Sequence, residues 1–179
     1  LSMLGSELMN QIILDPKVNS PGLALELLDI GIYNSIHRSG DSFQKDGIDL
    51  SICAFNENEN KFTFSGARRP IILWDGEKIH TFEPIPCSVC EMKERNEKPV
   101  EIEIPIKKGD RIYMFSDGYI DQFGGEKNKK FLIRRFKELI LELDKTPINK
   151  QKDIFMDKFS SWKRNQEQLD DVLVIGVEI

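Results

Sequence analysis

The chain contains little histidine, cysteine or tryptophan, and this scarcity excludes several kinds of site. Among 179 residues there are two His, three Cys and two Trp. An odd number of cysteines in a chain of this length does not indicate a secreted disulfide scaffold. Cys87 and Cys90 have the spacing of a zinc or redox pair, but no second cysteine pair completes four ligands. Neither His37 nor His80 lies at a finger-like spacing from them. The sequence favours an ordinary loop here over a structural zinc, and the cytoplasm as the compartment.

Long apolar runs and clustered positive charge are also missing. The longest apolar run is far shorter than the ~18 residues that a membrane span needs, so we expect no membrane contact by this domain. The formal net charge is −5, which argues against a nucleic-acid partner, since such binding requires gathered Lys and Arg. The densest basic segment, 127–137, is bordered by Glu126, Glu138 and Glu142. We interpret it as a solvated helix face.

The remaining composition is that of an ordinary globular protein. Hydrophobic residues make up 40% and charged residues 31%, enough for one domain with a substantial core, residues 1–179. Leu1 is not an initiator, and the chain opens within an apolar pattern without the features of a signal peptide. We therefore expect the natural protein to extend upstream.

Apolar residues recur with a helical period at both ends of the chain and with a period of two in between. Helices are predicted at 1–14, from Ser20-Pro21 to Ser39-Gly40, at 131–143 and at about 148–163. Strands are predicted at 48–55, 61–65, 71–74, 79–82, 100–104, 112–115 and 172–177. The last of these strands reads as buried, and residues 84–99 read as a loop. Because the connections between the middle strands are short, neighbouring strands should be antiparallel. The order of elements predicts an α+β fold with sheets inside and helices outside.

Acidic residues stand at the ends of two of the predicted strands. Asp117 follows the strand 112–115, and Asp170-Asp171 directly precedes the strand 172–177. If the two strands are neighbours in one sheet, these carboxylates could converge on one cation. Oxygen-only ligands suit Mg²⁺ or Mn²⁺. From spacing alone, the alternative that these acids are turn and capping residues is stronger.

Three ordered motifs resemble those of a known family. They are Phe64-Ser65-Gly66-Ala67-Arg68-Arg69-Pro70, Lys108-Gly109-Asp110-Arg111-Ile112-Tyr113-Met114-Phe115-Ser116-Asp117-Gly118-Tyr119-Ile120-Asp121, and Asp170-Asp171-Val172-Leu173-Val174-Ile175. Their order and separation resemble the bacterial phosphatases related to stage II sporulation protein E and the sigma-factor regulator RsbU, within the protein phosphatase 2C-type (PPM) family. Two further segments and one late tryptophan resemble the branch that is fused to sensory modules: Lys45-Asp46-Gly47-Ile48-Asp49, Gln122-Phe123-Gly124-Gly125 and Trp162.

The resemblance implies an α/β/β/α sandwich of two mainly antiparallel sheets, with this chain forming the C-terminal part of the domain. It also implies water activated by two Mn²⁺ or Mg²⁺ ions for attack on phosphoserine or phosphothreonine. By motif match, Asp117 and Asp170 would hold metal, with Asp171 as the reserve choice. No metal role carries over to Asp49, which is interpreted as a turn or edge residue.

The sequence assigns no catalytic and no substrate-binding residue. Arg68 or Arg69 could bind a phosphate through its guanidinium fork, although a surface charge is the favoured interpretation of either residue.

One family motif is missing from the chain. Family members carry an Asp-x-x-Gly-His-Gly-type sequence whose Asp bridges both metals, and neither His of this chain is followed by Gly. Residues 1–5 resemble the start of the helix that follows this motif. Without the bridging carboxylate two cations would repel each other, so we expect weak metal binding and little activity from these 179 residues. We also expect an uncovered sheet edge, through which a homodimer could form.

Two functional hypotheses follow. In the first, the parent protein dephosphorylates a phosphorylated signalling protein of the anti-sigma-antagonist type, under the control of upstream sensory domains that could be membrane-bound. In the second, the domain is a catalytically dead module that binds a phosphoprotein or another partner. An intact metal motif upstream would favour the enzyme, and its natural absence would favour the binding module.

Overall fold

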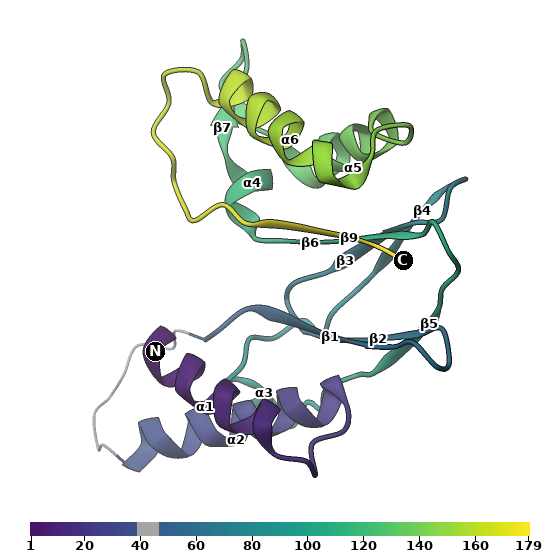
Figure 1. Ribbon diagram of the computed structural model, residues 1–179. Helices are drawn as coiled ribbons and strands as arrows, with labels where there is room; N and C mark the ends of the chain where they lie inside the picture. The colour runs from purple at the N-terminus through teal and green to yellow at the C-terminus, as the bar shows by residue number, and fades with distance from the viewer. Residues whose placement is uncertain (39–46) are drawn as a thin grey trace. The chain divides into compact units, whose positions relative to one another are not determined.

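The computed structural model describes residues 1–38 and 47–179, without the side chains of residues 37 and 38. The predicted helix end at Ser39-Gly40, the side chain of His37 and the first part of the segment Lys45–Asp49 therefore lie outside the described residues. The chain divides into two compact units (Figure 1), each built from two separate stretches of sequence. Unit 1 comprises Leu1–Pro70 and Phe82–Ile106, and unit 2 comprises Ile71–Thr81 and Lys107–Ile179.

Unit 1 is a three-stranded antiparallel sheet with helices on one face (Figure 1). The strand order is β1-β2-β5. Its elements are α1 (Ser2–Leu14), α2 (Pro21–Arg38), β1 (Leu50–Asn56), β2 (Lys61–Ala67), α3 (Met92–Arg95) and β5 (Ile102–Pro105). The predicted helices and antiparallel strands of this half are confirmed, with bounds shifted by one to three residues at most ends.

The helix α2 forms the centre of the core of unit 1. It begins at the predicted Ser-Pro start, where the Ser20 hydroxyl accepts a hydrogen bond from the Leu23 amide at 3.3 Å. Its apolar stripe of Leu25, Leu28 and Ile32 is at most 2% exposed. This stripe packs with buried residues from β2 and from the segment 85–92, which are Ala67, Ile85, Cys87, Val89 and Met92.

The segment 84–99 is not wholly a loop, because Met92–Arg95 form the short helix α3. A tertiary contact explains this difference from the prediction. Asp29 of α2 is 3% exposed, and its carboxylate accepts hydrogen bonds from the Cys90 amide at 2.6 Å and the Lys93 amide at 3.2 Å. Amides at the start of a helical turn need hydrogen-bond acceptors. Here the acceptor is a side chain of α2, which lies outside the segment 84–99.

We expect the buried Asp29 to make the stability of unit 1 pH-dependent. Burial raises the pKa of Asp29 above 3.8, although the amide hydrogen bonds oppose this effect. The folded state therefore holds the proton more tightly than the unfolded state. The contribution of Asp29 to stability should fall as the pH rises from about 3.8 through the higher folded pKa. In urea unfolding at several pH values, the free energy of unfolding of the wild type minus that of Asp29→Asn should decrease over this range. A difference that rises with pH would contradict the assignment.

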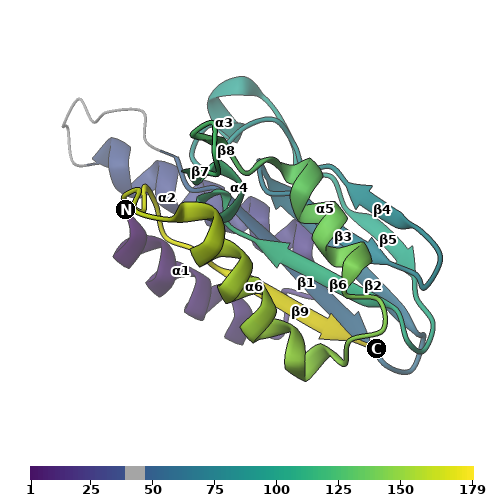
Figure 2. The same ribbon diagram turned by 90° about the horizontal axis from the view of Figure 1, so that it is seen from above.

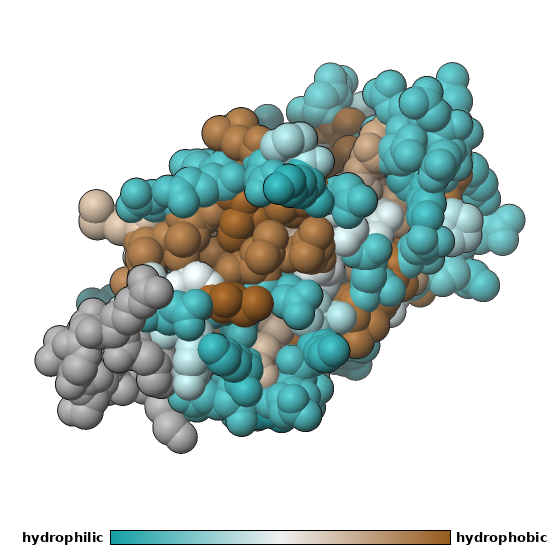
Figure 3. Space-filling view, turned by 90° about the horizontal axis from the view of Figure 1, so that it is seen from below, coloured by the Kyte–Doolittle hydropathy of each residue, from teal (hydrophilic) through white to brown (hydrophobic). Residues whose placement is uncertain are grey.

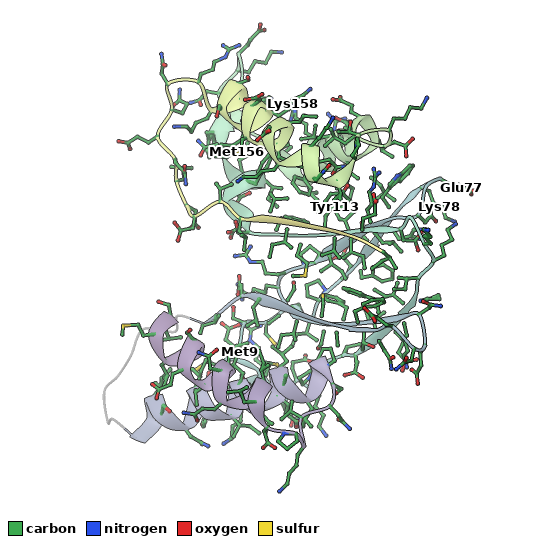
Figure 4. All side chains as sticks on the ribbon, viewed as in Figure 1. Met9, Glu77, Lys78, Tyr113, Met156 and Lys158 are labelled. Carbon is green, nitrogen blue, oxygen red and sulfur yellow. The ribbon has the colours of Figure 1, made fainter. Side chains whose placement is uncertain are left out.

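The outer face of α1 and α2 carries an apolar patch between hydrophilic residues. Figure 3 shows hydrophobic side chains gathered on the face that these two helices form. The most exposed large hydrophobic residues of α1 are Met3, Ile13 and Leu14, and Ile30 of α2 is 39% exposed. By contrast, Met9 packs inward against the core of unit 1 (Figure 4).

Unit 2 is a four-stranded sheet in the order β4-β3-β6-β9, with α5 and α6 over one face (Figure 2). Its elements are β3 (Ile71–Trp74), β4 (Ile79–Phe82), β6 (Arg111–Phe115), α4 (Asp117–Asp121), β7 (Phe123–Gly124), β8 (Lys129–Lys130), α5 (Leu132–Glu142), α6 (Ile148–Lys163) and β9 (Val174–Glu178). The strand β6 pairs antiparallel with both β3 and β9. Three of these elements, α4, β7 and β8, are not predicted from the sequence.

Aromatic side chains fill the core between this sheet and its helices. Phe136 of α5 is fully buried, and its ring centroid lies 4.5 Å from that of Phe115 and 5.2 Å from that of Tyr119. Tyr113 lies between β6 and the helices (Figure 4). Its hydroxyl donates to Gln151 Oε1 at 2.8 Å, which satisfies a buried polar group.

The prediction that the last strand is buried is wrong. Four of the five residues of β9 are exposed, including Ile175 (39%) and Val177 (43%). The strand is the last in its sheet and pairs with β6 on one side. A short apolar run cannot reveal this position, because central and edge strands can share the same pattern.

The predicted fold class, α+β with antiparallel sheets flanked by helices, is confirmed for both units. In the part of the chain that the structure describes, no helix has the length and apolar character of a membrane span.

Candidate metal site

The two predicted metal-binding acids lie at one end of the β6–β9 pair in unit 2. The register pairs Phe115 with Val174. Asp117 follows β6 by two residues, and Asp170-Asp171 precede β9, so the antiparallel pairing brings these acids to the same end. The condition stated for their convergence, that the two strands are neighbours, is met.

Asp117 is the first residue of α4, and its position is set by the strand before it. The Ser116 amide continues the β6–β9 pairing by donating to the Leu173 carbonyl at 3.0 Å. The Ser116 hydroxyl accepts from the Leu173 amide at 2.9 Å and donates to the Asp171 carbonyl at 2.7 Å. Asp117 itself is half-buried.

The segment that carries Asp170 and Asp171 passes directly over Gly118. A Cβ atom at Gly118 would lie 2.3 Å from the Asp171 carbonyl oxygen and 3.1 Å from that of Asp170. Only glycine permits this approach. Both acids are exposed, and Asp170 Oδ1 accepts from the Asp171 amide at 2.7 Å.

The donor set fits Mg²⁺ or Mn²⁺. Both ions prefer carboxylate, carbonyl and water oxygens, and Mg²⁺ sites in proteins often use only one or two carboxylates. Asp117 with Asp170, or with Asp171, supplies such a set on two elements joined by hydrogen bonds. Among the described residues no group of three or more His, Cys, Asp and Glu is close enough to hold a metal. The two acids therefore offer carboxylate oxygens from at most two side chains, and other ligands of a cation there would be water or backbone oxygens.

The arginines of the motif Phe64–Pro70 lie in unit 1 with carboxylate partners. Arg68 Nη2 is 3.2 Å from Glu91 Oε2, and Arg69 Nη2 is 3.4 Å from Asp49 Oδ2. Asp49 also accepts a hydrogen bond from the Ser88 hydroxyl. These residues line a cavity of about 760 Å³ in unit 1. The expected role of Asp117 and Asp170 as metal ligands does not depend on these residues of unit 1.

The cysteines and His80 have local environments that do not point to metal or redox chemistry. Burial raises the pKa of the Cys87 and Cys90 thiols, which keeps both protonated near neutral pH. His80 Nε2 lies 2.6 Å from Asp75 Oδ2 in the turn between β3 and β4. This contact, with the Lys78 and Glu77 amides, holds the pKa of Asp75 well below its usual range.

Sequence reasoning misses two residues beside the acids, Ser116 and Gln122. Gln122 follows α4 and is 1% exposed. Its Nε2 donates to the Phe123 carbonyl at 3.0 Å and to the Glu167 carbonyl at 2.8 Å. The motif that contains Gln122 is visible in the sequence, but its long-range partner is not.

The comparisons with known proteins give a family and a fold. The family model of stage II sporulation protein E (SpoIIE) matches residues 6–179. A comparison with curated proteins found no match.

Three solved structures are similar to this chain. The first is the SiaA-PP2C domain of Pseudomonas aeruginosa, with a TM-score of 0.86 and 21% identity over 99% of this chain and 68% of that one. The second contains the RsbU and RsbW domains of Rv1364c from Mycobacterium tuberculosis, with a TM-score of 0.71 and 17% identity over 99% and 46%. The third is the catalytic domain of the serine/threonine protein phosphatase PstP with two manganese ions, with a TM-score of 0.62 and 14% identity over 98% and 80%.

At these identities the structural likenesses show the fold, and the family model shows the family. The chain spans about two thirds of the SiaA domain and less than half of the Rv1364c structure. The predicted resemblance is confirmed: the chain belongs to the stage II sporulation protein E family and has the fold of PP2C-type phosphatase domains.

Proposed function

We propose that this chain is part of a metal-dependent protein serine/threonine phosphatase whose metal ligands include Asp117 and Asp170. The observation that carries the proposal is the antiparallel β6–β9 pair, extended by Ser116, which brings both acids to one end of the sheet in a SpoIIE-family chain. The likeness to a phosphatase domain that holds two manganese ions supports the choice of Mn²⁺ or Mg²⁺.

The residues of this chain have distinct roles in the proposed site. Asp117 presents its carboxylate from the start of α4, and Asp170 presents one from the segment before β9. Gly118 leaves room for that segment, and the Ser116 hydroxyl binds it through a hydrogen bond to the Asp171 carbonyl. When bound, Mn²⁺ or Mg²⁺ would lower the pKa of a water molecule and neutralise charge on the phosphoryl oxygens. Asp171 is the alternative to Asp170 as ligand.

We further propose that these 179 residues alone bind Mn²⁺ weakly and turn over little substrate. They contain no Asp-x-x-Gly-His-Gly-type motif, and two carboxylates neutralise only part of the charge of two divalent cations. Among the described residues no third carboxylate lies with Asp117 and Asp170, so in this proposal a further acidic ligand would come from another part of the natural chain.

The proposed substrate is a phosphoserine or phosphothreonine on a signalling protein. The motif resemblance to the sigma-factor regulator RsbU implies an antagonist of an anti-sigma factor as the class of substrate, and the likeness to a structure that contains RsbU and RsbW domains supports a regulatory partner. In this proposal the domain acts in the cytoplasm as the effector of a larger sensory protein.

Hydrolysis of a phosphoserine peptide, measured with and without Mn²⁺, tests the proposal. Two proteins are compared: the 179-residue chain and the longest natural chain that contains it. We expect Mn²⁺-dependent release of phosphate by the longer chain and at least about tenfold less by the shorter one. A folded longer chain that is inactive on several phosphopeptides, but binds them, would instead support the alternative of a phosphoprotein-binding module.

A further inference from the structure

The two residues that border α4 both bind the segment that carries Asp170. Before α4, the Ser116 hydroxyl bonds to the Asp171 carbonyl and the Leu173 amide. After α4, the Gln122 amide bonds to the Glu167 carbonyl. Asp117 therefore lies in the sequence between Ser116 and Gln122. Asp170 lies between their partners, Glu167 and Asp171.

The Ser116 hydroxyl is not used as a helix cap. Serine in this position usually accepts a hydrogen bond from the first turn of the helix that follows it. Here α4 shows no such side-chain bond from Ser116. Both bonds of the hydroxyl instead reach the segment 171–173, one as donor and one as acceptor.

The orientation of the Gln122 amide is fixed by its partners. Both of its close contacts, the carbonyls of Phe123 and Glu167, are acceptors, so the nitrogen must face them. The side chain is 1% exposed, and a buried amide that gives up these bonds loses them without compensation from water. Gln122 therefore holds Glu167 at a fixed place beside the end of α4.

The residues after Gln122 contact Trp162, which lies on the N-terminal side of the segment 167–173. The Gly125 amide donates to the Trp162 carbonyl at 2.8 Å, and Trp162 Nε1 donates to the Gln122 carbonyl at 3.0 Å. A Cβ atom at Gly124 would lie 1.9 Å from the Trp162 carbonyl oxygen. The motif Gln122–Gly125 and the late Trp162 thus form one attachment at the end of α6, from which the chain runs to Asp170.

We propose that Gln122 is a positioning residue for the metal ligands: together with Ser116 it fixes the segment 167–173 to both ends of α4, and so holds Asp170 beside Asp117. This inference rests on the proposed function for its metal readout. Gln122 contacts neither the metal nor the substrate in this account, and it acts through the backbone that carries Asp170.

Hydrogen–deuterium exchange of the 179-residue chain, without metal, tests the positioning directly. In Gln122→Met, which keeps the length of the side chain but has no donor, amides of 164–173 should exchange about tenfold faster. Amides of β6 should exchange as in the wild type. Gln122→Glu should have a larger effect at neutral pH, because a carboxylate would face two carbonyl oxygens. The matched control is Gln166→Met, at an exposed position of the same segment, which should exchange like the wild type.

The affinity for Mn²⁺, titrated with electron paramagnetic resonance detection, is the second readout. We expect Gln122→Met and Ser116→Ala each to weaken binding about tenfold, as is typical for residues that orient metal ligands. Ser116→Thr, which keeps the hydroxyl, should stay within about twofold of the wild type.

Equal exchange in 164–173 for Gln122→Met and Gln166→Met would overturn the proposal. If Gln122→Met does not fold, the Ser116 pair decides, and identical exchange and Mn²⁺ affinity in Ser116→Ala and Ser116→Thr would overturn it. Asp117→Asn in the same titration separates the two proposals. If that change leaves Mn²⁺ affinity unaltered while Gln122→Met accelerates exchange, the metal assignment fails but the attachment of the segment stands.

Discussion

Asp117→Asn should lower Mn²⁺-dependent hydrolysis of a phosphoserine peptide by roughly 10³-fold in the natural chain that contains these residues. Asn keeps the shape of the side chain and its place at the start of α4 but removes the negative charge that would hold the cation. The loss of metal assistance at a phosphoryl centre corresponds to about 4 kcal/mol of transition-state stabilisation. The measurement is kcat/KM at a fixed Mn²⁺ concentration, with circular dichroism as the check on folding.

The control for this prediction is Asp121→Asn, at the other end of the same helix. Asp121 forms an ion pair with Lys130 of β8 at 2.8 Å, and both side chains are a little under half exposed. Its replacement should cost at most about 1 kcal/mol of stability and leave activity within a fewfold of the wild type. If Asp117→Asn and Asp121→Asn had the same activity, Asp117 would not be a metal ligand.

Phe136→Ala should produce the largest loss of stability among single changes in unit 2. The ring is fully buried and has three aromatic neighbours, the nearest being Phe115 and Tyr119. Truncation removes buried apolar surface and leaves a cavity, at a typical cost of about 3–5 kcal/mol. For a chain of this size the melting temperature should fall by roughly 10 °C.

Leu141→Ala on the same helix is the matched control, because Leu141 is 46% exposed. Its cost should stay below about 1 kcal/mol. The two variants are compared by thermal and urea unfolding. Similar small losses in both would mean that α5 does not pack on the sheet through Phe136. Phe136→Ala should also disturb the proposed metal site, since Tyr119 of α4, the helix that begins with Asp117, belongs to the same hydrophobic cluster.

The sequence predicts the repetitive part of this fold well and its tertiary contacts poorly. The helix at 148–163 and the strands at 71–74 and 79–82 appear with the predicted bounds, because their periodicity and turn residues are local signals. The helix α3 is missed because its acceptor, Asp29, lies on another element. The exposure of β9 is missed because strand order is not encoded in the composition of a strand.

The candidate site shows the same division. Asp117 and Asp170 stand out in the sequence through their motifs at strand ends, but their proximity depends on β6 and β9 being neighbours, which spacing alone leaves open. Ser116 and Gln122 belong to motifs that the sequence shows, but nothing in those motifs indicates which distant residues they bind. A serine before a short helix normally reads as a cap, and a glutamine after it reads as a surface residue. Their bonds to residues more than forty positions later become visible only in the structure.

The most direct test of the metal assignment is a crystal structure, grown with Mn²⁺, of the longest natural chain that contains these residues, with data collected near the manganese absorption edge. We expect an anomalous peak within about 2.2 Å of a carboxylate oxygen of Asp117 and of one from Asp170 or Asp171, with water completing the coordination. A manganese ion bound elsewhere in well-ordered density, with Asp117 free of metal, would contradict it.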